Sequence, residues 1–247
     1  MFWRFSSLRG QRLHATDGEI GKVDDFLFDD ATWTIRYLVA DTGGWLSGRR
    51  VLIVPASIGE TRDGEEDLPV SLSKSQIENS PPVGSDQSVS RQHEEALHGH
   101  YGWLPYWSGA AQATGTINDE RGDFGVPLGE AEEKNGGDPH LRSMSEVEDY
   151  HVSASDGPIG HVEDFLLDPE GWSVRYLLID TRNWWPGKRV LVAPQWIDRM
   201  DWSAQEVHAT LTRDRIKACP EFDSDMAINR SFEERLYRHY DKIPYWA

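Results

Sequence analysis

Apolar and polar residues alternate along much of this chain in the pattern of β-strands. Ile35, Tyr37 and Val39 share one face of a predicted strand, because successive side chains of a strand point to opposite faces. Leu38 and Ala40 make the other face apolar as well. A strand that is apolar on both faces is covered on both faces. We therefore expect another element to pack on the outside of this sheet.

Further strands are predicted on either side. A longer strand begins near Ile20, and Gly21 lies where its apolar period breaks. A glycine inside a strand often marks a bulge or a sharp bend. The glycine-rich turn at 43–48 predicts a hairpin. A short last strand is expected near 70–72, followed by a brief helix that Ser73 can cap.

The whole pattern occurs twice, at a constant spacing of 139 positions. The spacing does not change along the chain, so no insertion or deletion separates the copies. A period of this length is a whole domain rather than one unit of a solenoid. The matching pairs include Asp17 and Asp156, Trp33 and Trp172, Arg36 and Arg175, His100 and His239, and Trp107 and Trp246.

Each copy ends in a predicted helix followed by Pro-Tyr-Trp. Leu97 and Tyr101, like their counterparts in the second copy, are four residues apart and form a narrow apolar stripe. Ser90 is a good N-cap for the first of these helices. We expect the helix and its aromatic end to cover the outer face of the sheet, assigned to Leu38 and Ala40.

These signals predict a mainly β protein of two tandem small antiparallel β-barrels, each with a short C-terminal helical extension. The expected domains span residues 1–107 and 144–247. The segment 108–143 between them is rich in Gly, Ala, Glu and Asp. It has too few apolar residues to fold alone, so we expect a flexible linker. Two domains of about 100 residues suit the chain length of 247.

The formal net charge of −17 limits the classes of partner. An acidic surface repels phosphate backbones and anionic membranes, so we expect neither nucleic-acid binding nor membrane insertion. The chain shows no signal-peptide pattern and no run of about 18 apolar residues. Cys219 is its only cysteine, which is compatible with a reducing compartment. The sequence therefore predicts a cytoplasmic protein.

A set of short motifs recurs in both copies. In the first copy they are Asp17-Gly18, Arg36-Tyr37-Leu38-Val39, Gly44-Trp45-Leu46 and Arg50-Val51-Leu52-Ile53. In this order the motifs resemble the PRC-barrel domain family, which is named for the cytoplasmic domain of the photosynthetic reaction-centre H subunit. The tail resembles the extension of bacterial stand-alone members. The resemblance implies a small, mostly antiparallel barrel in a bacterial protein, used for assembly rather than chemistry.

Candidate catalytic and metal-binding residues do not combine into a site. His93 and His98 are five residues apart on one predicted helix, whereas zinc ligation from a helix needs a spacing of four. The adjacent carboxylates Asp24-Asp25 point to opposite faces of their strand. We interpret His100 as a hydrogen-bonded structural histidine and expect Arg36 to contact a carboxylate of a neighbouring strand. We therefore expect no enzymatic activity, no cofactor and no metal.

Aromatic side chains are the candidate interface residues. Trp45, Trp184 and Trp185 lie on hairpin turns. There they either face a partner or fold back over the barrel end, and both interpretations stay open. The tail aromatics are expected to be buried against a sheet, or else to form an exposed partner site. They are Tyr106, Trp107, Tyr245 and Trp246.

The expected function is that of a non-enzymatic scaffold or adaptor, acting through contacts with a protein partner that the sequence does not identify. We expect the two barrels to pair within the chain about a pseudo-two-fold axis. Tandem fusion raises the effective concentration of the second copy to roughly millimolar, which makes homodimerisation of the chain optional. The alternative function is a small-ligand or metal-responsive binding protein with a site between the two barrels.

Overall fold

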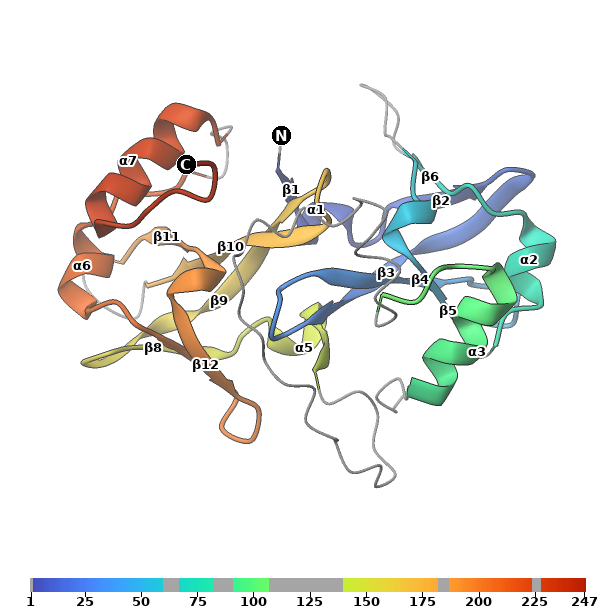
Figure 1. The fold of residues 1–247 in the computed structure, drawn as a ribbon, viewed down its shortest axis with the longest axis horizontal. Coiled ribbons are helices and arrows are strands. Elements are labelled where there is room, and N and C mark those ends of the chain that lie inside the picture. Colours follow the sequence, from blue (N-terminus) through green and yellow to red (C-terminus); the bar gives the residue numbers. More distant parts are fainter. Residues whose placement is uncertain (1, 60–66, 82–90, 107–139, 182–186, 224–227) are drawn as a thin grey trace. The chain divides into compact units, whose positions relative to one another are not determined.

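The structure, a computed structural model, describes residues 2–59, 67–81, 91–106, 140–181, 187–223 and 228–247. The chain forms two units, each assembled from separate pieces of sequence (Figure 1). Unit 1 consists of Met1–Arg9, Trp33–Ile35 and Ser143–Ala247, and unit 2 consists of Gly10–Thr32 and Arg36–Arg142.

Unit 2 is built around a sheet with the strand order β5-β4-β3-β2-β6, and β7 pairs with β3 beside this path. Strand β2 is antiparallel to β3, and β4 is antiparallel to β5, whereas β6 runs parallel to β2. The strands are β2 (Arg12–Ala15), β3 (Gly18–Asp29), β4 (Ile35–Asp41), β5 (Arg50–Ile53), β6 (Asp67–Pro69) and β7 (Leu141–Ser143). The helices are η1 (Pro55–Ser57), α2 (Lys74–Glu78) and α3 (Arg91–Tyr101).

Unit 1 is built around a sheet with the order β11-β10-β9-β8-β13-β12, and β1 pairs with β9 beside this path. Here β13 runs parallel to β8. The strands are β1 (Trp3–Arg4), β8 (His151–Ala154), β9 (Gly157–Asp168), β10 (Ser173–Asp180), β11 (Arg189–Val192), β12 (Ile197–Asp201) and β13 (Glu206–Ala209). The helices are α1 (Phe5–Leu8), α5 (Met144–Val147), η2 (Pro194–Trp196), α6 (Arg213–Ala218) and α7 (Arg230–Tyr240).

The repeat in the sequence is a repeat of structure. Strands β3 and β9 each have 12 residues, and their first residues are 139 positions apart. Helices α3 and α7 each have 11 residues and keep the same spacing. The predicted cap at Ser73 is present, since its side chain accepts a hydrogen bond from the backbone N–H of Gln76, and Asn229 caps α7 in the same way. Ser90, the predicted cap of α3, lies outside the described residues.

The break predicted at Gly21 is a β-bulge. Leu13 pairs with Gly21, and the register then shifts so that His14 pairs with Glu19. Gly21 has a φ of +126°, and a Cβ built on it would lie 2.0 Å from the carbonyl oxygen of Asp41. Glycine is therefore required here both by backbone conformation and by space.

The face of β4 that α3 covers is the opposite of the predicted one. Leu97 of α3 packs in a cluster with Tyr37 and Val39, not with Leu38 and Ala40. All of these residues are buried, so both faces of β4 are covered, as the pattern predicted. The prediction interchanged the two faces of β4 because both carry apolar side chains. The period of a strand alone does not distinguish its inner face from its outer face.

Other expectations need correction as well. Each sheet contains one parallel pair, because the connection through β5 and η1, or β11 and η2, is long enough to bring the last strand back in the direction of β2 or β8. Among the described residues, neither sheet closes into a barrel. The last strand of the first copy lies at Asp67–Pro69, slightly earlier than predicted.

The expected linker is described only at its end. Leu141–Ser143 form strand β7 rather than flexible chain, and residues 107–139 lie outside the described residues. Residues 1–9 and 33–35 group with the second copy rather than with the expected domain 1–107. Within the described part of the chain, no helix combines the length and the apolar character needed to cross a bilayer.

Candidate functional site

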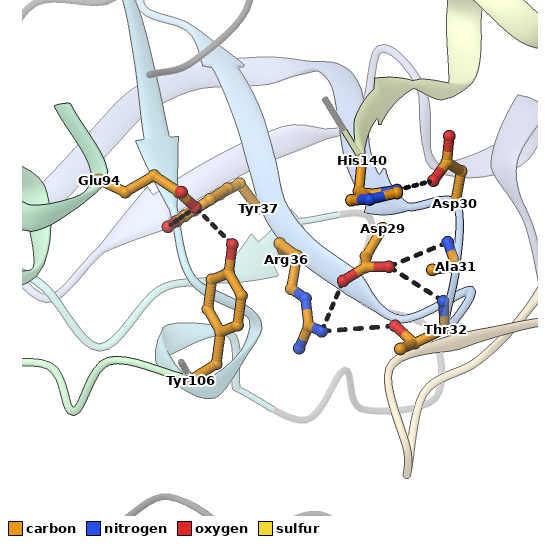
Figure 2. Close-up of polar contacts among 9 residues, drawn as sticks. All are labelled: Asp29, Asp30, Ala31, Thr32, Arg36, Tyr37, Glu94, Tyr106 and His140. Carbon is orange, nitrogen blue, oxygen red and sulfur yellow. Dashed lines mark hydrogen bonds and ion pairs between the residues drawn. The ribbon is translucent and has the colours of Figure 1, made fainter. Parts of the chain in front are cut away.

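A buried carboxylate links three elements of unit 2. The hydroxyl of Tyr37, on β4, donates a hydrogen bond to Oε1 of Glu94, on α3, at 2.9 Å. The hydroxyl of Tyr106, after α3, donates to the same oxygen at 2.8 Å. Glu94 is 0% exposed. Figure 2 shows the two phenols converging on this one oxygen, so the carboxylate ties the strand, the helix and the tail together.

Arg36 connects this carboxylate centre to the end of β3. Its guanidinium lies 4.0 Å from the ring centroid of Tyr106, in a cation–π contact. Its Nη2 also donates to Oδ2 of Asp29 at 2.9 Å (Figure 2). The predicted contact of Arg36 with a carboxylate of a neighbouring strand is therefore confirmed. Asp29 in turn accepts hydrogen bonds from the backbone N–H groups of Ala31 and Thr32, which fixes the turn.

The environment sets the protonation of these groups. Burial, followed by the charge of Glu94, raises the pKa of Tyr37 far above its ordinary value of 10.0. Tyr37 therefore remains a hydrogen-bond donor at any physiological pH. Burial raises the pKa of Asp29, but the hydrogen bond and charge of Arg36 outweigh it and leave the pKa below the ordinary value of 3.8.

Unit 1 contains the same network. The hydroxyls of Tyr176 and Tyr245 donate to Oε1 of Glu233 at 2.7 and 3.0 Å. Arg175 lies 3.9 Å from the ring centroid of Tyr245, and its Nη2 contacts Asp168 at 2.5 Å. Glu233 is 3% exposed. Two equivalent networks in two units indicate that the arrangement belongs to the repeat itself.

The two networks differ at one position. In unit 2, Nε2 of His98 lies 2.9 Å from the Tyr37 hydroxyl. In unit 1 the equivalent residue is Tyr237, whose hydroxyl accepts a hydrogen bond from Gln195 at 3.0 Å. Burial raises the pKa of Tyr237 to about 12. His98, considered above only as a candidate metal ligand, is thus a buried partner of a tyrosine.

The candidate interface residues of the tails have mixed positions. Tyr106 and Tyr245 are half-buried and belong to the two networks. Trp246 is half-buried, with its ring centroid 5.1 Å from that of Tyr237 and 3.9 Å from the Arg230 guanidinium. Trp107, with the hairpin residues Trp184 and Trp185, lies outside the described residues.

Trp45 lies at the rim of a surface hollow in unit 2. The hollow has a volume of about 490 Å³. The Trp45 side chain is only partly buried, and the ammonium of Lys74 lies 4.9 Å from its ring centroid. The hollow combines basic, acidic, small and aromatic residues. Its lining comprises Gly10, Arg12, Glu19, Gly21, Lys22, Asp41, Thr42, Gly43, Gly44 and Trp45.

The other candidate residues serve structural contacts. Asp24 pairs with Arg50 at 3.0 Å, whereas Asp25 accepts a hydrogen bond from the backbone N–H of Phe26. His100 shares a hydrogen bond with the backbone carbonyl of Gln76 at 2.8 Å, which agrees with its structural interpretation. No group of three or more possible metal ligands occurs among the described side chains.

Sequence reasoning did not single out Glu94 and Glu233. Each lies three residues before a buried leucine of the apolar stripe, at equivalent positions of the repeat. In the sequence they look like their exposed neighbours Glu95 and Glu234, because the helix dipole favours any acidic residue in the first turn. The sequence does contain a signal for them. Residues three apart share a helix face, so Glu94 lies on the face of Leu97 and Glu233 on the face of Leu236, whereas Glu95 and Glu234 do not.

Comparison with known proteins finds a family match in the first repeat. Residues 2–77 match the PRC-barrel domain family. The PRC-barrel match runs from β1 to α2 and ends before α3. An uncharacterized protein of Deinococcus radiodurans is 36% identical to this chain over 83 residues, which are 32% of this chain. The matched region spans about 30% of that protein's length.

Proposed function

We propose that the chain is a non-enzymatic tandem PRC-barrel protein that acts as a cytoplasmic scaffold or adaptor through protein–protein contacts. Residues 144–247 are its second PRC-barrel domain. The support is the recurrence of strands, helices and the tyrosine–glutamate network at one constant spacing. The net charge of −17 favours a soluble protein that does not bind nucleic acid.

The polar groups of the network support a structural rather than a catalytic role. A general base needs access to a substrate proton, and a nucleophile needs an adjacent base that activates it. The Tyr37 and Tyr106 hydroxyls instead both donate to buried Glu94. Their hydrogen-bonding capacity therefore stabilises the packing of the α3 tail on the sheet.

The observation that carries the adaptor proposal is the position of Trp45. The Trp45 side chain is only partly buried and lies at the rim of a hollow, where a partner could reach it. Tryptophan is among the residues that contribute most to binding energy at interfaces. Arg12, Lys22 and Glu19 around it would contact the polar flanks of a partner loop that inserts an apolar side chain.

The test is capture of partners from the source cell with the wild-type chain, Trp45→Ala and Leu104→Ala. Leu104 is 62% exposed in the same unit and serves as the matched control. We expect a protein retained by wild type and Leu104→Ala, whose affinity in purified form falls at least about tenfold with Trp45→Ala. Equal affinity for all three baits would exclude Trp45 as the contact, and no specifically retained protein would contradict the adaptor role.

The alternative function, a small-ligand or metal-responsive binding protein, is favoured by one observation. A hollow of about 490 Å³ lies within the usual size range of small-molecule sites. Native mass spectrometry of the chain purified from its source distinguishes the two functions. A small molecule bound in one-to-one ratio, and lost in Trp45→Ala, would support the alternative. An unliganded chain that binds its protein partner would support the adaptor.

A further inference from the structure

The leading segment of the first repeat lies in the unit formed mainly by the second repeat. Strand β1 pairs antiparallel with β9, with Trp3 opposite Leu167 and Arg4 opposite Leu166. In Figure 1 the blue β1 and α1 lie beside the gold strands of unit 1. The PRC-barrel match nevertheless runs continuously from residue 2 to residue 77. The segment thus belongs to one PRC-barrel sequence and completes the sheet of another.

A buried carboxylate anchors the segment. Asp164 on β9 is 1% exposed. Its two oxygens accept hydrogen bonds from Nε of Arg4 at 2.8 Å, from the backbone N–H of Ser6 at 3.1 Å and from the Ser6 hydroxyl at 2.6 Å. A buried charge is costly unless it is paired and hydrogen-bonded. A fourth donor, the backbone N–H of Phe165 at 2.8 Å, belongs to β9 itself. Removal of the leading segment therefore takes away three of the four hydrogen bonds that the structure describes for this carboxylate.

Aromatic contacts surround this anchor. Phe5 is fully buried, and its ring centroid lies 6.3 Å from that of Phe165. The rings of Trp3 and Trp172 make an edge contact at 5.7 Å. A third ring, that of Phe2, lies 5.9 Å from Tyr176, the tyrosine of the unit 1 network. The segment therefore has the features of a bound peptide, with a strand pairing, a charged anchor and apolar pockets.

The exchange is reciprocal. The leading segment of the second repeat contributes β7, which pairs with β3 in unit 2. Leu141 is 7% exposed and packs in the cluster of Tyr37 and Leu97. Leu141 and Phe2 are equivalent positions of the repeat, and each lies against the equivalent tyrosine. Each sheet thus receives the leading segment of the other repeat.

A second short piece of the first repeat also lies in unit 1. The backbone N–H of Ile35 donates to the carbonyl of Trp172, and the N–H of Val174 donates to the carbonyl of Trp33, both at 2.8 Å. These four residues are two pairs of repeat-equivalent positions, so the bonding is symmetric. Symmetric bonding between equivalent positions is the signature of an association between two identical copies.

We propose that the sheet of each repeat carries a specific binding site for the leading segment of another repeat, and that the partner that fits this site in trans is a second copy of this chain. Within one chain, fusion supplies the segment at an effective concentration of roughly millimolar. When that segment is removed, the same segment of a second chain occupies the site. The proposal does not depend on the function of Trp45.

The first test places a protease site between Arg9 and Gly10 of the full chain. Both residues are exposed, and the space around Gly10 is open. Cleavage is performed with a labelled peptide of residues 2–9 in excess, so that the released segment is always replaced. We expect one labelled peptide to remain per chain after gel filtration. Recovery of the chain without the label would overturn the proposal.

Two matched substitutions test the anchor. Asp164→Asn removes the negative charge that accepts hydrogen bonds from Arg4 and Ser6. The affinity for the peptide should fall by at least about tenfold. The adjacent Glu163→Gln disrupts a pair with Arg189 that lies outside the segment site, and should leave the affinity unchanged. Equal affinities in the two variants would contradict the assigned site. A peptide with alanine in place of Arg4 and Ser6 should bind the wild-type chain weakly. Its affinity should equal that of the natural peptide for the Asp164→Asn chain.

The second test examines the partner in trans. Cleaved wild-type chain, freed of its segment, is mixed with uncleaved Asp164→Asn chain, whose own segment is weakly held. Native mass spectrometry should show a complex of one copy of each. The complex should disappear when the donor also carries Arg4→Ala and Ser6→Ala. Monomers alone in the first mixture, with the labelled peptide still able to bind, would overturn the assignment of a second copy as the partner.

Discussion

At the scale of single residues, Glu94 and Glu233 stand out as carboxylates in fully or nearly fully buried positions. Two phenol donors for one carboxylate oxygen offset part of the cost of removing the charge from water. The strand, the helix and the tail of the repeat meet at this oxygen. The packing of α3 on β4 therefore depends on charge-assisted hydrogen bonds as well as on the apolar contacts of Leu97.

Glu94→Gln should lower the free energy of unfolding by about 1–3 kcal/mol, because the two tyrosine hydroxyls then donate to a neutral amide oxygen instead of a carboxylate. Urea denaturation measures the change. The neighbouring Glu95 is exposed on the same helix, and Glu95→Gln should stay within about 0.5 kcal/mol of wild type. An unchanged midpoint for Glu94→Gln would contradict a stabilising role for the charge of this carboxylate.

Asp29 should give the fold a specific acid sensitivity. Its pKa in the folded state lies below the ordinary value of 3.8. The stability it provides is therefore fully present above the unfolded pKa and is lost as pH falls through the folded pKa. Asp29→Asn should lower stability at neutral pH and flatten its decline below about pH 4. Parallel pH profiles for wild type and variant, measured by urea midpoints, would contradict this assignment.

At the scale of elements, the bulge of β3 controls how closely β3 approaches the end of β4. Gly21→Ala places a Cβ 2.0 Å from the carbonyl oxygen of Asp41 at a φ that disfavours any side chain. We expect a loss of roughly 3 kcal/mol or more in the free energy of unfolding. Gly99→Ala, in open space within α3, should instead raise it by about 0.5–1 kcal/mol. Thermal denaturation of both variants makes the comparison.

Prediction from sequence succeeded where local chemistry decides the element. The bulge at Gly21, the cap at Ser73 and the helix covering β4 all follow from residues close in the chain. It did not find β12, and it assigned the wrong face of β4 to the helix. Both faces of β4 are apolar, and only the tertiary position of Tyr37 beside Glu94 decides between them.

At the scale of the whole molecule, the repeat could be predicted but the exchange of segments could not. A period shows that two copies have the same fold, and it does not show which copy provides each strand. Phe2 and Leu141 have equivalent positions and each lies against the equivalent tyrosine, so position in the repeat does not show which sheet each segment completes. The choice is made by tertiary contacts such as the pairing of Arg4 with Asp164, whose residues are 160 positions apart, and no local pattern records it.

Cleavage within residues 107–139 should leave two fragments that remain associated under native conditions. The first fragment carries residues 1–9, which lie in unit 1, and the second carries Leu141 and Arg142, which lie in unit 2. We expect the fragments to co-elute in gel filtration and to separate in urea. Fragments that elute independently and keep their secondary structure would contradict this expectation and favour two autonomous domains.

The pairing of Arg4 with Asp164 also fixes an order of events during synthesis. The two residues are 160 positions apart, so a ribosome adding roughly 5–20 residues per second completes the receiving strand about 10–30 seconds after the leading segment emerges. Unit 2 has all its strands once Leu141 and Arg142 are made, whereas unit 1 still awaits its strands β8 to β13. Trp3 and Phe5 are therefore exposed on the nascent chain throughout this interval, as targets for chaperones and for neighbouring chains on the same messenger.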